Sequence, residues 1–196
     1  LIFVTIRRVH CILQFCARHE RAILGNLAQD PNFISATSFY VDQADIMRAV
    51  RMEKGKRWVE NIKTPQPGRG EVLVSTKACG ICGSDLHAAK HTSDFVQTSI
   101  ETGGAFKLTT FDPVVLGHEF CAEVVEHGPK TDKTHAVGQL VCSIPVRLQS
   151  DRNHLAVGYS TETPGGFAEH MVLSERMLLP VPTGTPATAS LSTPPS

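Results

Sequence analysis

Residues 47–182 form a series of short apolar runs separated by turns rich in glycine and proline. Residues 71–78 alternate apolar and polar side chains and include β-branched residues, which predicts a strand. The Pro- and Gly-rich segment PQPGRG before them predicts a turn. No stretch shows the sustained helical periodicity of a coiled coil or helical bundle. The pattern therefore predicts a small, mainly β domain with antiparallel strands.

Three further segments, VVLGHEFCAEVVEHG, VGQLVCSIPV and GGFAEHMVLSERMLLPVP, are also typical of strands. A short helix is expected to begin at Ser84 or Asp85, both favourable at helix N-termini, and to continue through LHAAK. Residues 91–112 are expected to form a long polar loop. The Gly165-Gly166 pair is expected to form a turn that leads into the last strands.

The two ends of the chain differ from its centre. Residues 1–46 are expected to be a leader of uncertain structure, disordered or not native, because the segment is apolar and basic and the first methionine is Met47. Its charges interrupt the roughly 20 apolar residues that a membrane helix needs. Residues 183–196 carry no charge and no apolar periodicity, so we expect a tail or a truncated connection.

Charge and cysteine spacing exclude several classes of function. Lys and Arg total 19 and Asp and Glu total 19, so there is no electrostatic basis for a nucleic-acid or acidic-membrane partner. Of the six cysteines, Cys79 and Cys82 are closely spaced and the others are scattered. This spacing excludes a paired zinc ribbon and favours free thiols, so we expect a cytoplasmic protein.

Cys82 and His118 are the candidates for chemistry. Each is flanked by glycine, at Gly80, Gly83 and Gly117, which permits tight turns around a small ion. Thiolate and imidazole are typical zinc ligands, and a catalytic zinc has three protein ligands and one open position. Other interpretations remain open at this point: a buried structural cysteine, a redox-active CGIC pair, and a histidine and glutamate that make ordinary hydrogen bonds at a strand end.

The segments CGICGSDLH and GHE, with PGRGEVLV before them and GGFAEHMVL after them, closely resemble the catalytic domain of zinc-dependent medium-chain alcohol and polyol dehydrogenases. The resemblance covers residues 47–182 and implies a GroES-like β-barrel with short helices. It also implies that Cys82 and His118 bind one catalytic zinc and that Glu119 binds the metal or one of its ligands. Asp85 then holds the histidine ligand in the required tautomer.

The same resemblance implies a reaction. Ser84 would receive the proton of the substrate hydroxyl, and His87, which is otherwise interpreted as a solvated helix residue, would pass that proton to solvent. The substrate would be a small alcohol or polyol and the hydride acceptor NAD(P). The full-length protein is expected to be soluble, with a homo-oligomer as one allowed state.

The chain also departs from the pattern of these enzymes. The segment after Cys142 lacks the four close cysteines of a structural zinc lobe, so we expect one catalytic zinc and no structural zinc. Thr193 stands where polyol-type relatives have the glutamate that serves as third ligand. No GxGxxG motif follows a strand, so a Rossmann coenzyme domain is not expected in this sequence.

Two functional hypotheses follow from the resemblance and the departures. The chain is expected to be the catalytic-domain portion of a zinc-dependent oxidoreductase that is inactive alone. The alternative is a non-catalytic GroES-like remnant that acts as a binding module.

Overall fold

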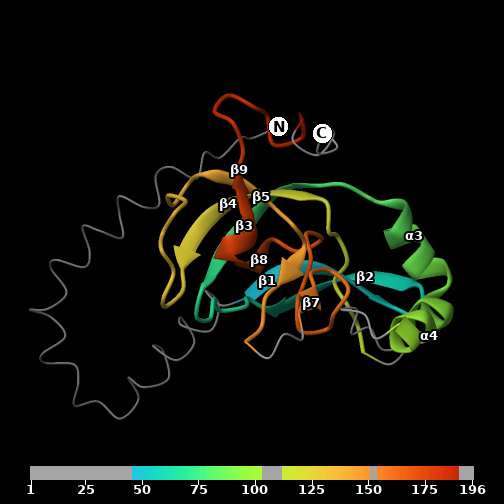
Figure 1. Ribbon diagram of the computed structural model, residues 1–196. Helices are drawn as coiled ribbons and strands as arrows, with labels where there is room; N and C mark the ends of the chain where they lie inside the picture. Colours follow the sequence, from blue (N-terminus) through green and yellow to red (C-terminus); the bar gives the residue numbers. More distant parts are fainter. Residues whose placement is uncertain (1–45, 103–111, 151–153, 190–196) are drawn as a thin grey trace, which may run out of the picture. The chain divides into compact units, whose positions relative to one another are not determined.

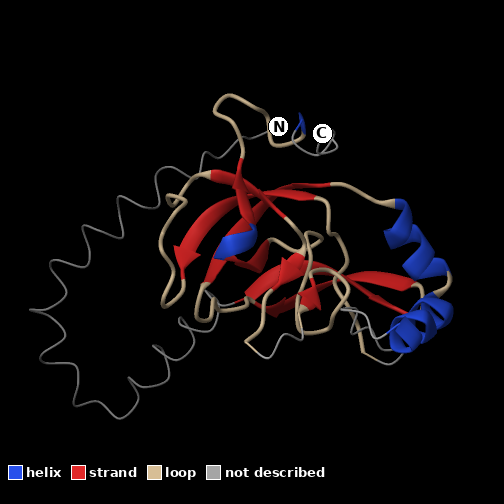
Figure 2. Cartoon of the chain, in the orientation of Figure 1, coloured by secondary structure: helices blue, strands red, loops and turns tan. Residues whose placement is uncertain are grey.

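The structure is a computed structural model of the 196-residue chain, and it describes residues 46–102, 112–150 and 154–189 (Figure 1). The predicted leader lies outside the described residues except for Ile46, which begins the first strand. Residues 190–196 of the predicted tail also lie outside them. Most of the regular structure consists of strands, as Figure 2 shows, which confirms the predicted mainly β class. No helix within the described residues is long and apolar enough to span a membrane.

Strands β1 (Ile46–Glu53) and β2 (Lys56–Lys63) form an antiparallel hairpin. Lys54 and Gly55 form its two-residue turn, with φ of 49° and 76°, and this left-handed geometry matches the twist of the two strands. β1 alternates exposed and buried residues from Ile46 to Val50, with Met47 and Ala49 buried, and Met52 near its end is buried as well.

The main sheet has five strands in the order β8–β3–β4–β5–β9, and every pairing in it is antiparallel. The strands are β3 (Glu71–Cys79), β4 (Phe120–His127), β5 (Leu140–Ser143), β8 (His170–Ser174) and β9 (Leu178–Pro180). A short 3-10 turn, η2 (Glu175–Met177), joins the last two. β3 confirms the strand predicted at residues 71–78. Its place inside the sheet, between β8 and β4, fits Val72 and Val74, which are completely buried in the main core cluster.

The two α-helices among the described residues lie next to each other in sequence. α3 (Gly83–Lys90) occupies the position predicted for a short helix. The long polar loop predicted at residues 91–112 is wrong, because α4 (Thr92–Thr102) forms within it. Its inward positions include Thr92 and Ser99 as well as the half-buried Phe95. Polar residues on the buried face thus hid the helical periodicity that sequence reasoning depends on.

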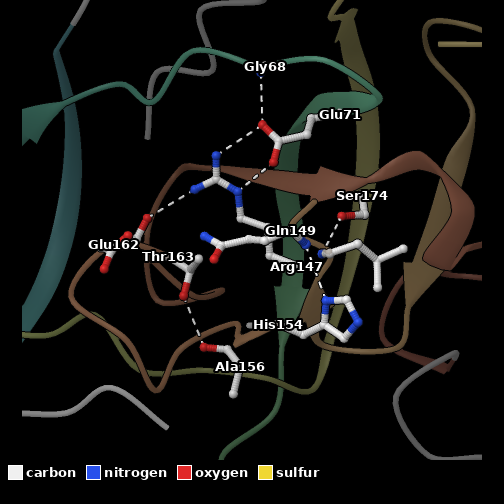
Figure 3. Close-up of polar contacts among 10 residues, drawn as sticks. Gly68, Glu71, Arg147, Gln149, His154, Ala156, Glu162, Thr163 and Ser174 are labelled. Atoms are coloured by element: carbon white, nitrogen blue, oxygen red, sulfur yellow. Dashed lines mark hydrogen bonds and ion pairs between the residues drawn. The ribbon is translucent and has the colours of Figure 1, made fainter. Parts of the chain in front are cut away.

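A small lobe follows β5, where the sequence lacks closely spaced cysteines. It contains the two-residue strands β6 (Val146–Arg147) and β7 (Leu155–Ala156). Figure 3 shows that polar contacts join this lobe to the sheet: Arg147 pairs with Glu71 of β3, and the backbone N–H of Leu148 donates to Ser174 Oγ at 2.8 Å. The lobe is therefore held by hydrogen bonds and an ion pair between protein groups.

Candidate active site

The N-terminus of α3 positions three of the predicted site residues. Cys82 is the N-cap, with an extended backbone, and Ser84 and Asp85 lie in the first turn. The carboxylate Oδ2 of Asp85 accepts the backbone N–H of Cys82 at 3.0 Å, which satisfies a donor that the helix leaves unpaired. This hydrogen bond fixes the backbone at Cys82 relative to Asp85.

His118 follows a tight corner at Gly117, whose φ of 98° suits glycine. The backbone of the Gly165-Gly166 pair lies against this corner, and Gly166 N–H donates to Gly117 O at 2.7 Å. The pair therefore does more than form a turn, since a side chain at Gly165 would collide with the backbone at Gly117 and one at Gly166 would collide with Cys79. β4 begins at Phe120, after this corner, and so covers only the later part of the strand expected from VVLGHEFCAEVVEHG.

The fold brings Cys82, His118 and Glu119 together. One potential ligand atom from each residue lies within 4.8 Å of the other two, and no other His, Cys, Asp and Glu trio within the described ranges meets this condition. Tetrahedral zinc with bonds of about 2.0–2.3 Å would separate its ligand atoms by roughly 3.5 Å. Small side-chain movements would therefore suffice, and the thiolate, imidazole and carboxylate donor set fits zinc.

Asp85 lies on the other side of the His118 ring from Ser84. His118 Nδ1 is 3.4 Å from Asp85 Oδ1, and His118 Nε2 is 3.4 Å from Ser84 Oγ. Interaction with Asp85 raises the pKa of His118, against the effect of burial. Burial would raise the pKa of Asp85, but hydrogen bonds from His118 and the Cys82 backbone more than offset this, so that pKa is lowered.

The two cysteines of the CGIC segment have different environments. Donation from the Ser84 hydroxyl, with further hydrogen bonds from the Ser84 backbone and His118, lowers the pKa of Cys82. Burial, followed by the nearby charges of Asp85 and Glu119, raises the pKa of Cys79 to about 12. Cys79 packs against Gly117 and Gly166, whereas Cys82 lies in the ligand trio. None of the four cysteines in the described part of the chain forms a disulfide.

His87 lies on the exposed side of α3. Its ring centroid is 5.0 Å from that of His91 and 6.3 Å from that of Phe95. His87 is therefore not one of the converging residues. It follows Ser84 by three positions, so the two residues lie on neighbouring turns of the same helix face.

Sequence reasoning missed Tyr159, which lies after β7. Its hydroxyl donates to Ser84 Oγ at 2.9 Å, and its ring centroid is 5.0 Å from that of His118. The surrounding letters, AVGYS, match no motif that would have identified this residue. Only the fold brings it to Ser84.

An apolar cavity of about 250 Å³ adjoins the site. Val50, Leu86 and Phe167 contribute to its walls, with Arg57 as the one cationic residue. Among the predicted site residues, Asp85 alone lines it, so this cavity is separate from the trio of potential ligands.

Residues 68–183 match the family described as the alcohol dehydrogenase GroES-like domain. The chain is 31% identical over 134 residues to L-threonine 3-dehydrogenase of Coxiella burnetii (strain RSA 493 / Nine Mile phase I), an alignment that covers 64% of this chain and 36% of that protein. It is 34% identical over 138 residues to L-threonine 3-dehydrogenase of Streptomyces avermitilis, covering 65% and 37%. The chain thus spans little more than a third of the length of these relatives.

Solved structures give the same result for the fold. The 2R,3R-butanediol dehydrogenase of Bacillus subtilis has a TM-score of 0.58 at 26% identity, with 74% of this chain and 43% of that chain covered. A zinc-binding dehydrogenase from Sinorhizobium meliloti, solved with NADP bound, has a TM-score of 0.56 at 31% identity, with 74% and 41% covered. These matches confirm the GroES-like fold predicted from the sequence. The chain belongs to the zinc-dependent medium-chain alcohol dehydrogenase family and carries its GroES-like catalytic domain.

Proposed function

We propose that this domain binds one zinc ion through Cys82, His118 and Glu119 and that it supplies the metal and proton-transfer half of an NAD(P)-linked alcohol or polyol oxidation. The convergence of these three donor groups within 4.8 Å carries the proposal. Two similar proteins are named as a butanediol dehydrogenase and a threonine dehydrogenase, and these names support a small substrate that carries a hydroxyl group.

The zinc-binding part of the proposal is supported by the protonation states that the surroundings of Cys82 and His118 favour. The lowered pKa of Cys82 favours the thiolate, which is the metal-binding form. Asp85 lies beside Nδ1 of His118 and would keep the proton on that nitrogen, leaving Nε2 as the ligand atom. Zinc, when bound, would supply Lewis-acid stabilisation of the substrate alkoxide.

The proton half of the proposal rests on Ser84 and His87. Ser84 Oγ lies 3.4 Å from His118 Nε2, so a hydroxyl bound beside the metal ligands would be within reach of it. A serine hydroxyl accepts one proton as it releases its own. His87, exposed on the same helix face, would release that proton to solvent.

NAD(P) has no corresponding site in the described residues. Dinucleotides bind at a glycine-rich turn between a parallel strand and a helix, and all strand pairs across residues 46–102, 112–150 and 154–189 are antiparallel. We therefore assign the coenzyme to the whole protein, on the basis of the relative solved with NADP, and derive no hydride step for this domain.

Zinc titration of the purified 196-residue chain tests the proposal directly. We expect one zinc per chain by elemental analysis and calorimetry. Cys82→Ser and His118→Ala should each weaken binding at least about tenfold, because each removes a ligand. Cys142→Ser is the matched control, since Cys142 is also half-buried and outside any disulfide but does not belong to the trio.

The alternatives give different results in the same experiment. A chain that binds no zinc, or that loses none of its affinity in the Cys82 and His118 variants, would contradict the proposed function and favour a GroES-like binding module. Binding of two zinc ions per chain would contradict the single-site assignment.

A further inference from the structure

Tyr159 was not predicted as a site residue, yet it contacts several residues of the candidate site. Its side chain is nearly completely buried, at 4% exposure. The hydroxyl donates to Ser84 Oγ at 2.9 Å and lies 3.5 Å from Asp85 Oδ1. One phenol thus contacts both the proposed proton acceptor and the carboxylate beside His118.

The aromatic ring of Tyr159 is held between two elements. It stacks on Phe95 of α4, with ring centroids 5.3 Å apart and planes inclined by 20°. On another side it meets the His118 ring, 5.0 Å away at 40°. Offset stacking favours a fixed ring position, so the hydroxyl reaches Ser84 from an ordered side chain.

The two hydroxyl contacts are not equivalent. A phenol carries one proton, and 2.9 Å is within the normal range for O–H···O hydrogen bonds whereas 3.5 Å is long. Ser84 is therefore the main acceptor. A serine oxygen has two lone pairs and one proton, so donation from Tyr159 occupies one lone pair. The other lone pair and the Ser84 proton are then directed away from Tyr159.

We propose that Tyr159 is a positioning residue that holds the Ser84 hydroxyl in one rotamer, in which its oxygen lies beside His118 Nε2 and can exchange a proton with a substrate hydroxyl bound there. This inference rests on the proposed function, in which Ser84 is the proton acceptor. Without the phenol, the contacts to His118 and Cys82 would be the remaining restraints on the Ser84 side chain, so more than one of its staggered χ1 positions would be populated. Burial, which raises the pKa of Tyr159, keeps the phenol protonated and able to donate.

Nuclear magnetic resonance of the whole chain can measure the Ser84 rotamer directly. Tyr159→Phe keeps the ring and its stacking and removes only the hydroxyl. We expect the χ1 couplings of Ser84 to report one rotamer in the unsubstituted chain and averaged rotamers in Tyr159→Phe. Thr131→Val is the control: it removes a hydroxyl that donates to Gly128 O at 2.9 Å, and it should leave the Ser84 couplings unchanged.

Zinc affinity and thermal stability show whether Tyr159 positions Ser84 or instead supports the fold as a whole. Tyr159→Phe should keep zinc affinity within about threefold, because the hydroxyl is not a ligand, and should keep the melting temperature of the chain within about 4 °C. Unchanged Ser84 couplings in Tyr159→Phe would overturn the inference, and so would averaged couplings that accompany loss of zinc binding. Failure of the unsubstituted chain to bind zinc would instead contradict the proposed function, so the two failures are distinguishable.

Discussion

Nε of Arg147 lies 2.5 Å from Oε1 of Glu71, which joins the small lobe to the first residue of β3 (Figure 3). A second contact, from Nη2 to Oε2 at 3.0 Å, makes the pair bidentate. The Glu71 side chain is 9% exposed, and it also accepts the N–H of Gly68 at 2.8 Å. The ion pair therefore fixes the lobe that carries Tyr159 to the sheet whose β3 strand leads to Cys82.

Removal of Arg147 should destabilise the fold strongly. Arg147→Ala leaves the Glu71 carboxylate buried without its cation, so we expect a loss of about 2–4 kcal/mol in the free energy of unfolding, measured with urea. Arg48→Ala is the control, because the Arg48–Glu169 pair is 73% and 43% exposed. That control should cost less than about 1 kcal/mol. Equal effects of the two substitutions would contradict a special role for the Arg147–Glu71 pair.

Glu175 should make stability depend on pH. Its carboxylate accepts the backbone N–H groups of Asp132 at 2.7 Å and Thr134 at 3.0 Å. Burial would raise the pKa of Glu175, but these hydrogen bonds more than offset it and lower the pKa. A carboxylate with a lowered folded-state pKa stabilises the fold above its unfolded pKa of about 4.3, and this contribution is lost as pH falls through the folded value.

Glu175→Gln tests this dependence. At neutral pH we expect the variant to be about 1–2 kcal/mol less stable in urea unfolding. The difference from the unsubstituted chain should shrink below about pH 4, where the glutamate becomes protonated. A stability difference that stays constant down to about pH 2 would contradict the assignment.

Cys79 should be the slow thiol of the CGIC segment. Because burial raises its pKa to about 12, little thiolate exists at neutral pH, and only the thiolate reacts with iodoacetamide. Peptide mass spectrometry should find Cys82 alkylated well before Cys79, and zinc should protect Cys82 alone. Equal labelling rates for the two cysteines would restore the redox-pair interpretation.

Ser84 and His87 should affect catalysis to different degrees. When the domain is joined to the coenzyme-binding part of a relative, Ser84→Ala should lower kcat by about 10²- to 10⁴-fold, the usual range for lost acid–base assistance. His87→Ala should lower it less, because water can replace an exposed group. Zinc content, measured in parallel, should stay at the unsubstituted level in both. Full activity of Ser84→Ala would exclude Ser84 as the proton acceptor.

The structural elements that were predicted correctly from the sequence are those that local residue patterns determine. The alternation in β3 follows from a strand with a two-residue repeat, and the helix after Cys82 follows from residues that favour its first turn. The pairing of Cys82 with His118 followed from the resemblance, since spacing alone does not bring distant residues together. The structure places one ligand atom from each within 4.8 Å of the other.

The parts that sequence missed depend on contacts between distant segments. Tyr159 reaches Ser84 from 75 positions away, and no local letter pattern records such a hydrogen bond. α4 was missed because Thr92 and Ser99 occupy its buried side, where an apolar residue would have signalled a helix. The Gly165-Gly166 pair looks like an ordinary turn until the backbone at Gly117 is known to lie against it.

Gly117 should tolerate substitution much less than another glycine with a similar backbone. Gly117 and Gly138 have φ of 98° and 87°, so alanine at either position should cost about 1–2 kcal/mol in backbone strain. A Cβ at Gly117 would also lie 2.9 Å from both Cys79 Sγ and the Phe167 backbone nitrogen, whereas nothing lies within 4 Å at Gly138. We therefore expect Gly117→Ala to lower the free energy of unfolding by about 3–5 kcal/mol and to weaken zinc binding through displacement of the adjacent His118. Equal unfolding energies for the two variants would show that the segment after Gly117 can move without cost, and the corner would then have no part in positioning His118.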